Sequence, residues 1–345
     1  MAPPSPPSSL DPYIATLRNP GLNESQALAV ESVLAPRHFT LSLIHGPPGT
    51  GKTVVVCQLV KRIVTSTRNP KILLCAPTQA AVDQALARID RNRNGVRNIV
   101  RIGDSSKIRP SVRHLAIGHG RNRAQEQQAL DKAVVIGATL VAASRISEDY
   151  DWDAIIVDDA GQATEPEILL ALVGASASKC TKIVLVGDHM QLPHLVPDLV
   201  VQKTGFNRSL LERLVENGAG VSFLDTQFCI HPSLAAISSE HFYDDRLKTP
   251  LNLDRTAPWH VDNVLGIATW INVLSPHEDY YDADDRRRSR YREEEVTAVV
   301  ALLKRIPTTL PGAPPEIGIL TGYAAQRKAI QEALETEGID REHVE

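Results

Sequence analysis

A glycine-rich segment, Gly46 to Thr53, reads GPPGTGKT and leaves few possible folds for this chain. The aliphatic run FTLSLI at 39–44 precedes it and predicts a buried strand, whereas the following TVVVCQLVKRI has the pattern of a helix. The form G-x-x-x-x-G-K-[ST] between a strand and a helix is typical of a phosphate-binding loop, because its glycines let backbone N–H groups turn inward around an anion. We therefore predict a P-loop NTPase fold, with an ordinary Gly/Pro turn as the alternative.

Two side chains of this loop have expected chemical roles. The Lys52 ammonium is expected to reach the β- and γ-phosphates of ATP, and the Thr53 hydroxyl is expected to bind Mg²⁺. The start of the helix adds the positive end of its dipole. The candidate ATP-binding residues of the loop are Gly46, Pro47, Pro48, Gly49, Thr50, Gly51, Lys52 and Thr53.

Aliphatic runs alternate with helical patterns along the chain, which predicts a doubly wound, largely parallel α/β sheet. Aromatic residues make up only 4% of the chain, so the core is expected to be aliphatic. The predicted strands are 39–44, 71–76, 98–102, 133–138, 154–157, 182–186, 221–225, 267–273 and 316–321, and the predicted helices are 24–35, 51–66, 79–90, 164–173, 232–240, 292–305 and 323–336. Because the pattern restarts after about residue 218, we expect two domains, 20–218 and a shorter 219–345, after a Pro/Ser-rich disordered stretch at 1–19.

Polar residues directly follow two of the predicted strands. Asp158 and Asp159 come after the first of them, where a P-loop protein needs a second magnesium carboxylate. We expect Asp158 to hold Mg²⁺ and Asp159 to orient the attacking water. Gln191 follows the next aliphatic run and is expected to sense the γ-phosphate, so Lys52, Asp159 and Gln191 are the candidate catalytic residues. A carboxylate pair that caps a helix and a plain Gly-Asp turn are the alternatives.

The segment 91–123 is strongly basic within a chain whose net charge is −4. Its only acid is Asp104, and its cations are Arg91, Arg93, Arg97, Arg101, Lys107, Arg109, Arg113, Arg121 and Arg123. One-signed charge of this kind favours nucleic-acid contact, with a solvated loop as the alternative. The mixed charges of 278–295 indicate a surface turn instead.

Three segments, the loop 46–53, the run from Asp158 and the run from Gly187, follow one another along the chain. In this order they resemble the helicase core of superfamily 1, in the group that contains the nonsense-mediated-decay RNA helicase and the immunoglobulin mu-binding helicase. The most diagnostic runs are DDAGQATEPE from Asp158 and GDHMQLP from Gly187. Further matching blocks lie at 22–30, 76–83, 137–139, 209–214, 227–232, 242–243 and 317–326, so that the resemblance covers about 20–337.

The resemblance implies two RecA-like domains, the second incomplete, with ATP and Mg²⁺ at their interface and single-stranded RNA or DNA across them. The resemblance implies that Gln26 contacts adenine, and a capping box with Asn23 is the alternative reason for a glutamine at this position. Phe228 is expected to stack on adenine. The expected nucleic-acid contacts are Thr78, Gln79, Thr139 and Thr321, joined by Arg109 and Arg113 from the basic segment.

The chain also departs from the family pattern. Asp159 stands where the family has Glu, Cys229 stands where it has an arginine finger, and Gly322 replaces a proline. The family's Gln-Gly block and its last Arg-bearing block would follow Glu345, so the sequence is expected to be truncated before them. An arginine finger contributes roughly 10³–10⁵ to the rate, so rapid ATP turnover is not expected.

Three functions remain open on these residues. The first is an ATP-dependent helicase or translocase, and the second is a degenerate helicase module that binds ATP and nucleic acid, or scaffolds partners, without unwinding. The third is an AAA+ ATPase, against which the GDHMQLP run from Gly187 argues. The sequence does not decide between RNA and DNA.

The rest of the sequence excludes other classes. No stretch approaches 18 apolar residues, so we expect no membrane span, and the N-terminus has no basic and apolar signal pattern. Four separated cysteines predict neither a disulfide framework nor a zinc site. We therefore expect an intracellular protein, cytoplasmic or nuclear, that is not secreted.

Overall fold

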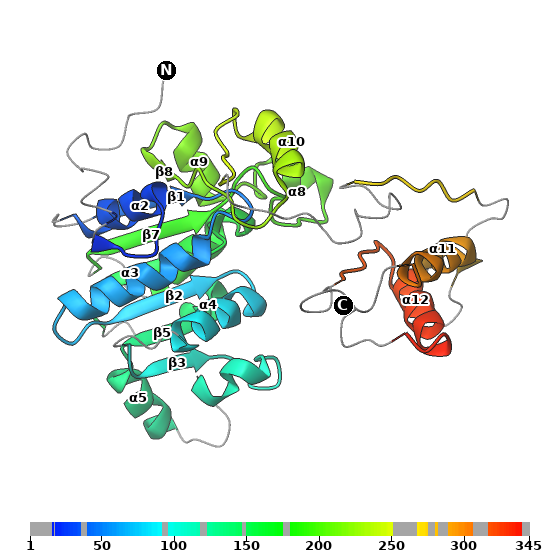
Figure 1. Ribbon diagram of the computed structural model, residues 1–345. Coiled ribbons are helices and arrows are strands. Elements are labelled where there is room, and N and C mark those ends of the chain that lie inside the picture. The colour runs from blue at the N-terminus through cyan, green and yellow to red at the C-terminus, as the bar shows by residue number, and fades with distance from the viewer. Residues whose placement is uncertain are drawn as a thin grey trace. The chain divides into compact units, whose positions relative to one another are not determined.

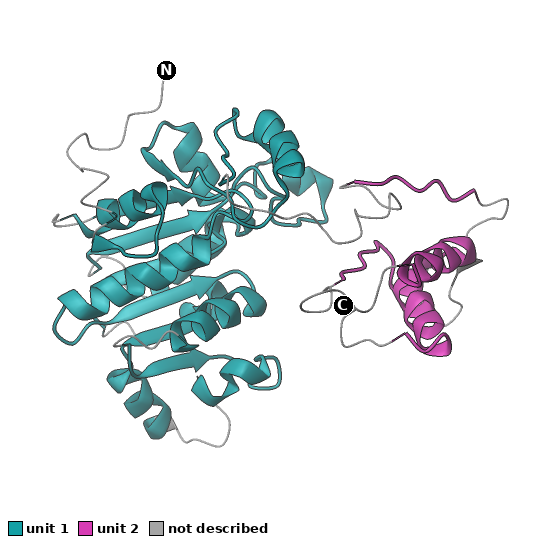
Figure 2. Cartoon of the chain, in the orientation of Figure 1, with its two compact units in different colours: residues 1–253 teal, residues 254–345 magenta. Residues whose placement is uncertain are grey.

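The structure, a computed structural model, divides the chain into two compact units, Met1–Leu253 and Asp254–Glu345 (Figures 1 and 2). The described residues are 16, 18–35, 40–91, 96–117, 123–146, 150–174, 180–250, 268–274, 280–281, 289–305 and 317–339. Each unit is described by itself below.

The first unit is built on one eight-stranded sheet in which every neighbouring pair is parallel. Its order is β4-β3-β5-β2-β6-β7-β1-β8. The strands are β1 (Thr40–His45), β2 (Ile72–Ala76), β3 (Ile99–Ile102), β4 (Ala116–Ile117), β5 (Val135–Thr139), β6 (Ala154–Val157), β7 (Lys182–Gly187) and β8 (Val221–Phe223). Because all are parallel, their carboxyl ends meet at one edge of the sheet, which is where ligands bind in open α/β sheets.

Helices cover both faces of this sheet, as the doubly wound prediction requires. The face seen in Figure 1 is covered by α2 (Glu24–Leu34), α3 (Lys52–Ser66) and α4 (Gln79–Arg91). The other face packs against α6 (Leu140–Ala143), α7 (Glu165–Gly174) and α9 (Leu210–Glu216). Alternate residues of one strand enter different cores, as Leu73 and Leu74 of β2 do, because side chains point to opposite faces of a strand.

The remaining elements of the first unit are short or lie at its margins. They are a 3₁₀ turn at Pro110–Leu115, α5 (Arg123–Lys132), a second 3₁₀ turn at Ala160–Gln162, α8 (Leu199–Lys203) and α10 (Pro232–Phe242). No helix among the described residues has the length and apolarity needed to cross a membrane.

In the second unit, α11 (Glu293–Leu303) packs on α12 (Ala324–Thr336) through four buried aliphatic side chains, Val296, Val300, Ile330 and Leu334. The antiparallel strands β9 (Tyr280–Tyr281) and β10 (Arg290–Tyr291) are its only sheet within the described residues. The strands predicted at 267–273 and 316–321 are therefore wrong for the described positions 268–273 and 317–321, where Ile317 forms only an isolated bridge.

Two boundaries differ from the sequence-based expectation. The first compact unit continues past residue 218 to Leu253, because β8 pairs in parallel with β1 and completes the sheet. Within the stretch 1–19, the described Asn19 is buried and its Nδ2 donates to Glu31 Oε1 at 3.0 Å, whereas 1–15 and 17 lie outside the described residues. The expectation of disorder therefore does not extend to Asn19.

Candidate functional site

The glycine-rich loop joins the carboxyl end of β1 to the first residue of α3, as predicted. Gly51 precedes the helix with φ 80° and has no side chain, so the first N–H groups of α3 receive no side-chain cap. Gly49 also has a positive φ of 73°, a conformation that residues with a side chain rarely adopt. The Gly46 N–H donates to Gly187 O at 2.9 Å, which fixes the loop against β7. An uncapped helix start behind such a loop is suited to bind an anion.

Lys52 is folded back onto its own loop. Its Nζ donates to Gly46 O at 2.8 Å, and the Thr50 hydroxyl donates to Pro47 O at 2.7 Å. The ammonium thus closes a small ring of backbone groups at the place where phosphates are expected. A nucleotide would have to replace the Gly46 carbonyl as the partner of this cation.

Gln26 contacts the loop from the start of α2. It forms the capping box with Asn23, in which Gln26 N donates to Asn23 Oδ1 at 2.8 Å and Asn23 N donates to Gln26 Oε1 at 3.1 Å. The other end of the buried amide, Nε2, donates to Thr50 O at 2.8 Å. The capping alternative is therefore confirmed, and Gln26 also tethers α2 to the phosphate-binding loop.

Asp158 lies at the carboxyl end of β6 and is only 5% exposed. Burial, reinforced by the nearby charge of Asp159, raises the pKa of Asp158 to about 7, although the Asp159 N–H and the Lys52 charge act in the opposite direction. The Asp159 N–H donates to Asp158 Oδ1 at 3.0 Å, and no side chain of the described residues hydrogen-bonds to the Asp158 carboxylate. A buried carboxylate with a raised pKa lacks a close cation, which is the condition that a metal ion relieves.

The Thr53 hydroxyl and the Asp158 carboxylate fit the magnesium site that the family implies. Both offer oxygen donors, which Mg²⁺ prefers, and it usually binds one or two carboxylates together with phosphate oxygens. The described residues contain no cluster of three or more His, Cys, Asp or Glu side chains that would hold a metal by themselves. A magnesium ion here would therefore share its shell with the nucleotide.

Asp159 has a left-handed backbone, with φ 53°, and is partly exposed next to Asp158. Asp tolerates this conformation better than most residues, and such strain gathers at functional sites. Two glycines then interlock the turn after Asp159 with the end of β7: a Cβ on Gly161 would lie 2.3 Å from Asp188 O, and a Cβ on Gly187 would lie 2.6 Å from Gly161 N. Only glycine permits this backbone approach, which brings the two most diagnostic sequence runs together.

Asp188 organises the turn after β7 that carries Gln191. The sequence-based prediction did not include Asp188 among the site residues. His45 Nε2 lies 2.9 Å from its Oδ1, while Gln191 Nε2 and the Tyr243 hydroxyl each donate to its Oδ2 at 2.8 Å. Burial alone would raise the pKa of Asp188, but the hydrogen bonds from these three groups and the His45 charge lower it to about 2. Gln191 is therefore held at the sheet edge by an ionised carboxylate.

A loop after β8 lies directly against the phosphate-binding loop. The Phe228 N–H donates to Gly49 O at 2.9 Å, and a Cβ on Gly49 would lie 3.0 Å from Cys229 Cβ. The fully buried Gln227 shapes this loop, since its Oε1 accepts the N–H groups of Cys229 and Ile230 at 2.9 and 2.7 Å. The structure therefore brings Phe228 and Cys229 to the glycine-rich loop within the first compact unit. Gln227 is a second residue that the sequence-based prediction did not include.

Three of the expected nucleic-acid contacts lie near one another at the same sheet edge. Ala76 pairs with Thr139 across β2 and β5, and Thr78 follows Ala76 by two residues. Thr78 Oγ1 accepts the Ala81 N–H at 3.1 Å and thereby caps α4, whose first residue is Gln79. Thr139 caps α6 in the same way, with Ala142 N at 3.3 Å.

The basic segment serves two purposes in the structure. Arg109 and Arg113 are exposed, as the nucleic-acid interpretation requires. Arg101 is fully buried in β3 and its Nε donates to Asp83 Oδ1 at 2.7 Å, so it is not a surface cation. Positions 92–95 and 118–122 of this segment lie outside the described residues. Thr321 is exposed in the second unit, whose placement relative to these residues is not described.

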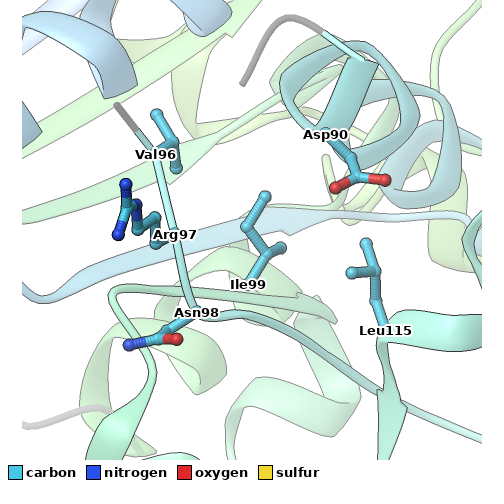
Figure 3. Close-up of a pocket in the computed structure, with 6 residues that line it drawn as sticks. All are labelled: Asp90, Val96, Arg97, Asn98, Ile99 and Leu115. Carbon is cyan, nitrogen blue, oxygen red and sulfur yellow. The ribbon is translucent and has the colours of Figure 1, made fainter. Parts of the chain in front are cut away.

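A cavity of about 580 Å³ lies apart from this edge (Figure 3). Its walls come from the end of α4, the approach to β3 and the end of the 3₁₀ turn: Asp90, Val96, Arg97, Asn98, Ile99 and Leu115. Since β3 begins at Ile99, the cavity opens at the amino end of that strand. The phosphate-binding loop lies at the carboxyl end of the sheet, so the cavity and this loop are separate features.

Comparison with known proteins supports the same family along most of the chain. One family model described as an AAA domain matches residues 21–122 and 118–197, and a second AAA-domain model matches 206–345. "ATP-dependent helicase upf1" of Schizosaccharomyces pombe is 31% identical over 96% of this chain and 40% of its own length. "Regulator of nonsense transcripts 1" of Dictyostelium discoideum is 31% identical over 96% of this chain and 27% of its own length. The chain thus spans less than half of these relatives.

Two further proteins are less similar to this chain. The mouse protein "3'-5' exoribonuclease HELZ2" is 29% identical over 92% of this chain and 13% of its own length. The crystal structure of the UvsW helicase from bacteriophage T4 gives a TM-score of 0.37 at 17% identity, over 58% of each chain, which is too low to support the fold; the parallel sheet and its loop do so instead. From its matching domains and relatives, the chain belongs to the superfamily 1 helicases, the family of ATP-dependent helicases that carry these AAA domains.

Proposed function

We propose that this chain binds ATP with Mg²⁺ at the loop 46–53, binds single-stranded RNA or DNA at the starts of α4 and α6, and couples the two as part of a helicase or translocase. The observation that carries this proposal is the meeting of three blocks at one sheet edge: the loop with Lys52, the buried Asp158, and Gln191 held by Asp188. Relatives named as regulators of nonsense transcripts favour RNA as the strand.

The nucleotide is proposed to bind through the backbone of the loop and the uncapped start of α3. Lys52 would exchange Gly46 O for the β- and γ-phosphates, a charge-assisted bond that is roughly twice as strong as a neutral one. Phe228 is proposed to stack on adenine, because its backbone already bonds to Gly49 at the loop. Gln26 would contact adenine only if its Nε2 left Thr50 O, so the observed hydrogen bond supports a role as a tether between α2 and the loop.

Thr53 and Asp158 are proposed to hold Mg²⁺ beside the phosphates, and the ion when bound would neutralise charge that develops on the leaving group. Asp159, partly exposed beside Asp158, is the group we propose to accept a proton from the attacking water. Gln191 donates its Nε2 to Asp188, so its Oε1 remains as an acceptor for a water proton. In this state Gln191 would have to leave Asp188 before it donated to a phosphate oxygen.

The single strand is proposed to contact the sheet edge through Thr78, Gln79 and Thr139. Two helix starts and neutral hydrogen-bonding side chains suit backbone phosphates and do not read base sequence. Arg109 and Arg113 would add non-specific attraction, and Thr321 is a proposed contact from the second unit.

Cys229 supports a second candidate, a helicase-like module that binds ATP and turns it over slowly. The exposed Cys229 lies beside Gly49, where the family pattern has an arginine, and Asp159 is one methylene shorter than the usual Glu. The two candidates share nucleotide binding and differ in the rate of hydrolysis.

Calorimetric titration with ATP and Mg²⁺ tests nucleotide binding. Lys52→Ala should weaken binding about 100-fold, because a hydrogen bond to a charged group contributes up to about 3 kcal/mol. Lys61→Ala, on the same helix but away from the loop, is the matched control and should bind like wild type. Equal affinity of wild type and Lys52→Ala would contradict the nucleotide site.

Strand-stimulated ATP hydrolysis separates the two candidates. If the module is a weakened helicase, Asp159→Glu combined with Cys229→Arg should raise turnover at least about tenfold, or ~1.4 kcal/mol of barrier. Each single variant is measured beside the double variant. A wild-type rate that is already fast, with no gain in the variants, would favour the active helicase.

A further inference from the structure

Arg101 is a fully buried arginine within the strand β3, beneath the first turn of α4. All three of its guanidinium nitrogens are engaged. Nε donates to Asp83 Oδ1 at 2.7 Å, Nη1 donates to Ile102 O, and Nη2 donates to Gln79 Oε1. A buried guanidinium needs such a complete set of partners, because an unpaired buried charge is very costly.

Asp83 ties this arginine to a later part of the basic segment, at Arg109. Its second oxygen, Oδ2, accepts the Arg109 N–H at 2.9 Å, and Asp83 itself is only 1% exposed. One buried ion pair therefore links α4, β3 and the backbone that leads into the exposed Arg109 and Arg113. A side chain on Gly103 would approach Arg101 Nη1 to 3.2 Å and Gln79 Oε1 to 3.5 Å, so the turn after β3 also closes over this group.

The contact with Arg101 fixes which end of the Gln79 amide faces outward. A guanidinium has donors only, so it can be met only by the carbonyl oxygen of Gln79, and the amide Nε2 must point elsewhere. No described residue hydrogen-bonds to that Nε2. Gln79 is also the first residue of α4, where the helix dipole favours an anion. The outward group is therefore a hydrogen-bond donor at a positive helix end, which matches a phosphate oxygen.

We propose that Arg101 is a positioning residue for single-strand binding: buried and without contact to the strand, it holds Gln79 with its Nε2 outward as a phosphate donor. The inference rests on the proposed strand-binding function of this edge. Arg101, a cation of the basic segment that adds no surface charge, thereby gains a role in the same interface. Without Arg101, the Gln79 amide would present either end to the strand and would lose its preference for an acceptor.

A double-mutant cycle measured by fluorescence anisotropy with a labelled single-stranded oligonucleotide tests this role. Gln79→Ala should weaken binding about tenfold in the wild-type background, as expected for a hydrogen bond to a charged phosphate. In the background Arg101→Met with Asp83→Asn, the same change should cost less than about twofold. This background removes both charges together, which is better tolerated than removing one, and its Asn side chain keeps an acceptor for Arg109 N.

A second variant keeps the test independent of the buried substitutions. Gln79→Glu keeps an oxygen for Arg101 but presents a carboxylate oxygen outward, so it should bind the strand more weakly than Gln79→Ala. Thr139→Val is the matched control: Thr139 lies at the same edge without contact to Arg101, so its cost should be equal in both backgrounds. Thermal unfolding of each variant confirms that the protein is folded.

The outcomes separate the inference from the function on which it rests. If wild type binds the strand but Gln79→Ala costs the same factor in both backgrounds, or Gln79→Glu binds as well as Gln79→Ala, the positioning role is overturned and strand binding stands. If wild type does not bind the oligonucleotide, the proposed strand site is overturned and the inference falls with it.

Discussion

Helices α3 and α4 both begin at the carboxyl edge of the same sheet, after β1 and β2, but their first turns are built differently. α3 follows Gly51, has no side-chain cap and has its loop closed by Lys52. α4 follows Thr78, whose hydroxyl accepts the Ala81 N–H. An uncapped start leaves backbone donors for a compact, highly charged anion such as the phosphates of ATP. A capped start has fewer such donors, so its contact with an anion falls to side chains such as Gln79.

The supports beneath the two starts differ in the same way. The loop 46–51 before α3 is held by backbone contacts, among them Phe228 N to Gly49 O, and by the uncharged Gln26, which leaves Lys52 able to exchange its partner. The α4 start rests on the buried pair Arg101 and Asp83, whose geometry leaves no alternative partner. If the two proposed sites are correct, a nucleotide that binds and leaves would meet exchangeable bonds at the start of α3, whereas the strand would meet a helix start held by a fixed ion pair.

The largest expected effect comes from a substitution in the loop before α3, at a position where the backbone has a positive φ. Gly51→Ala would place a Cβ 2.7 Å from Gln26 Nε2 at φ 80°, so it adds left-handed strain and displaces the Gln26 tether. We expect a loss of about 3 kcal/mol in the free energy of unfolding, together with weaker ATP binding. Gly218→Ala, also at φ 80° but with no atom within 4 Å, is the matched control and should lose only about 1–2 kcal/mol. Equal losses in chemical denaturation would show that Gln26 supports the loop very little.

The next effect concerns the carboxylate beside that loop. The pKa of Asp158 is raised from 3.8 to about 7 by burial and by Asp159, so the contribution of this carboxyl to the stability of the ligand-free protein should be largest below about pH 4 and should fall as the pH rises to about 7. Asp158→Asn should abolish this dependence in thermal unfolding from pH 4 to 8 while weakening magnesium-dependent ATP binding. Asp151→Asn, at an exposed position, is the control and should keep the wild-type profile.

The cap of α4 is a smaller term. Thr78→Ala removes the acceptor for Ala81 N and should cost about 1 kcal/mol in the free energy of unfolding. It should also weaken strand binding while leaving ATP affinity unchanged, because the α3 start does not depend on it. Ser209→Ala removes the comparable cap of α9, with Glu212 N at 3.0 Å, and should lower stability without altering strand affinity. If both variants weaken strand binding equally, the α4 start is not part of the interface.

The smallest expected effect per residue belongs to the exposed cations near α4. Arg109→Ala and Arg113→Ala should each reduce the slope of log affinity against log salt by about 0.7 for a single strand, provided that each contacts one phosphate. Gln79→Ala should leave the slope unchanged, since it removes no charge. Arg68→Ala, an exposed position on the approach to β2 at the opposite edge of the sheet, is the control. A slope that does not respond to Arg109 and Arg113 returns them to the solvated-loop interpretation.

The sequence predicted the first unit well because its signals there are local. The strand–loop–helix around Lys52 and the aliphatic runs of β1, β2 and β5 to β7 appear in the structure where they were expected. The capping box of Asn23 and Gln26 is also local, since the two residues are three positions apart. In the second unit the helices α11 and α12 were expected, but the strands at 268–273 and 317–321 were not formed, because an aliphatic run becomes a strand only when a neighbouring strand accepts its hydrogen bonds.

The order of residues alone was therefore enough to predict the phosphate-binding loop, the parallel α/β class and the family, since each depends on residues that are close together in the chain. The partners that meet across long separations became visible only in the folded structure. It joined Asp188 to His45 and Tyr243, brought Cys229 to Gly49, and removed Arg101 from the surface charge. The reason is that burial and pairing depend on the packing of elements that are distant in the chain, such as α4 on β2 and β5. A run of basic residues in the sequence does not reveal which of them lies beneath a helix.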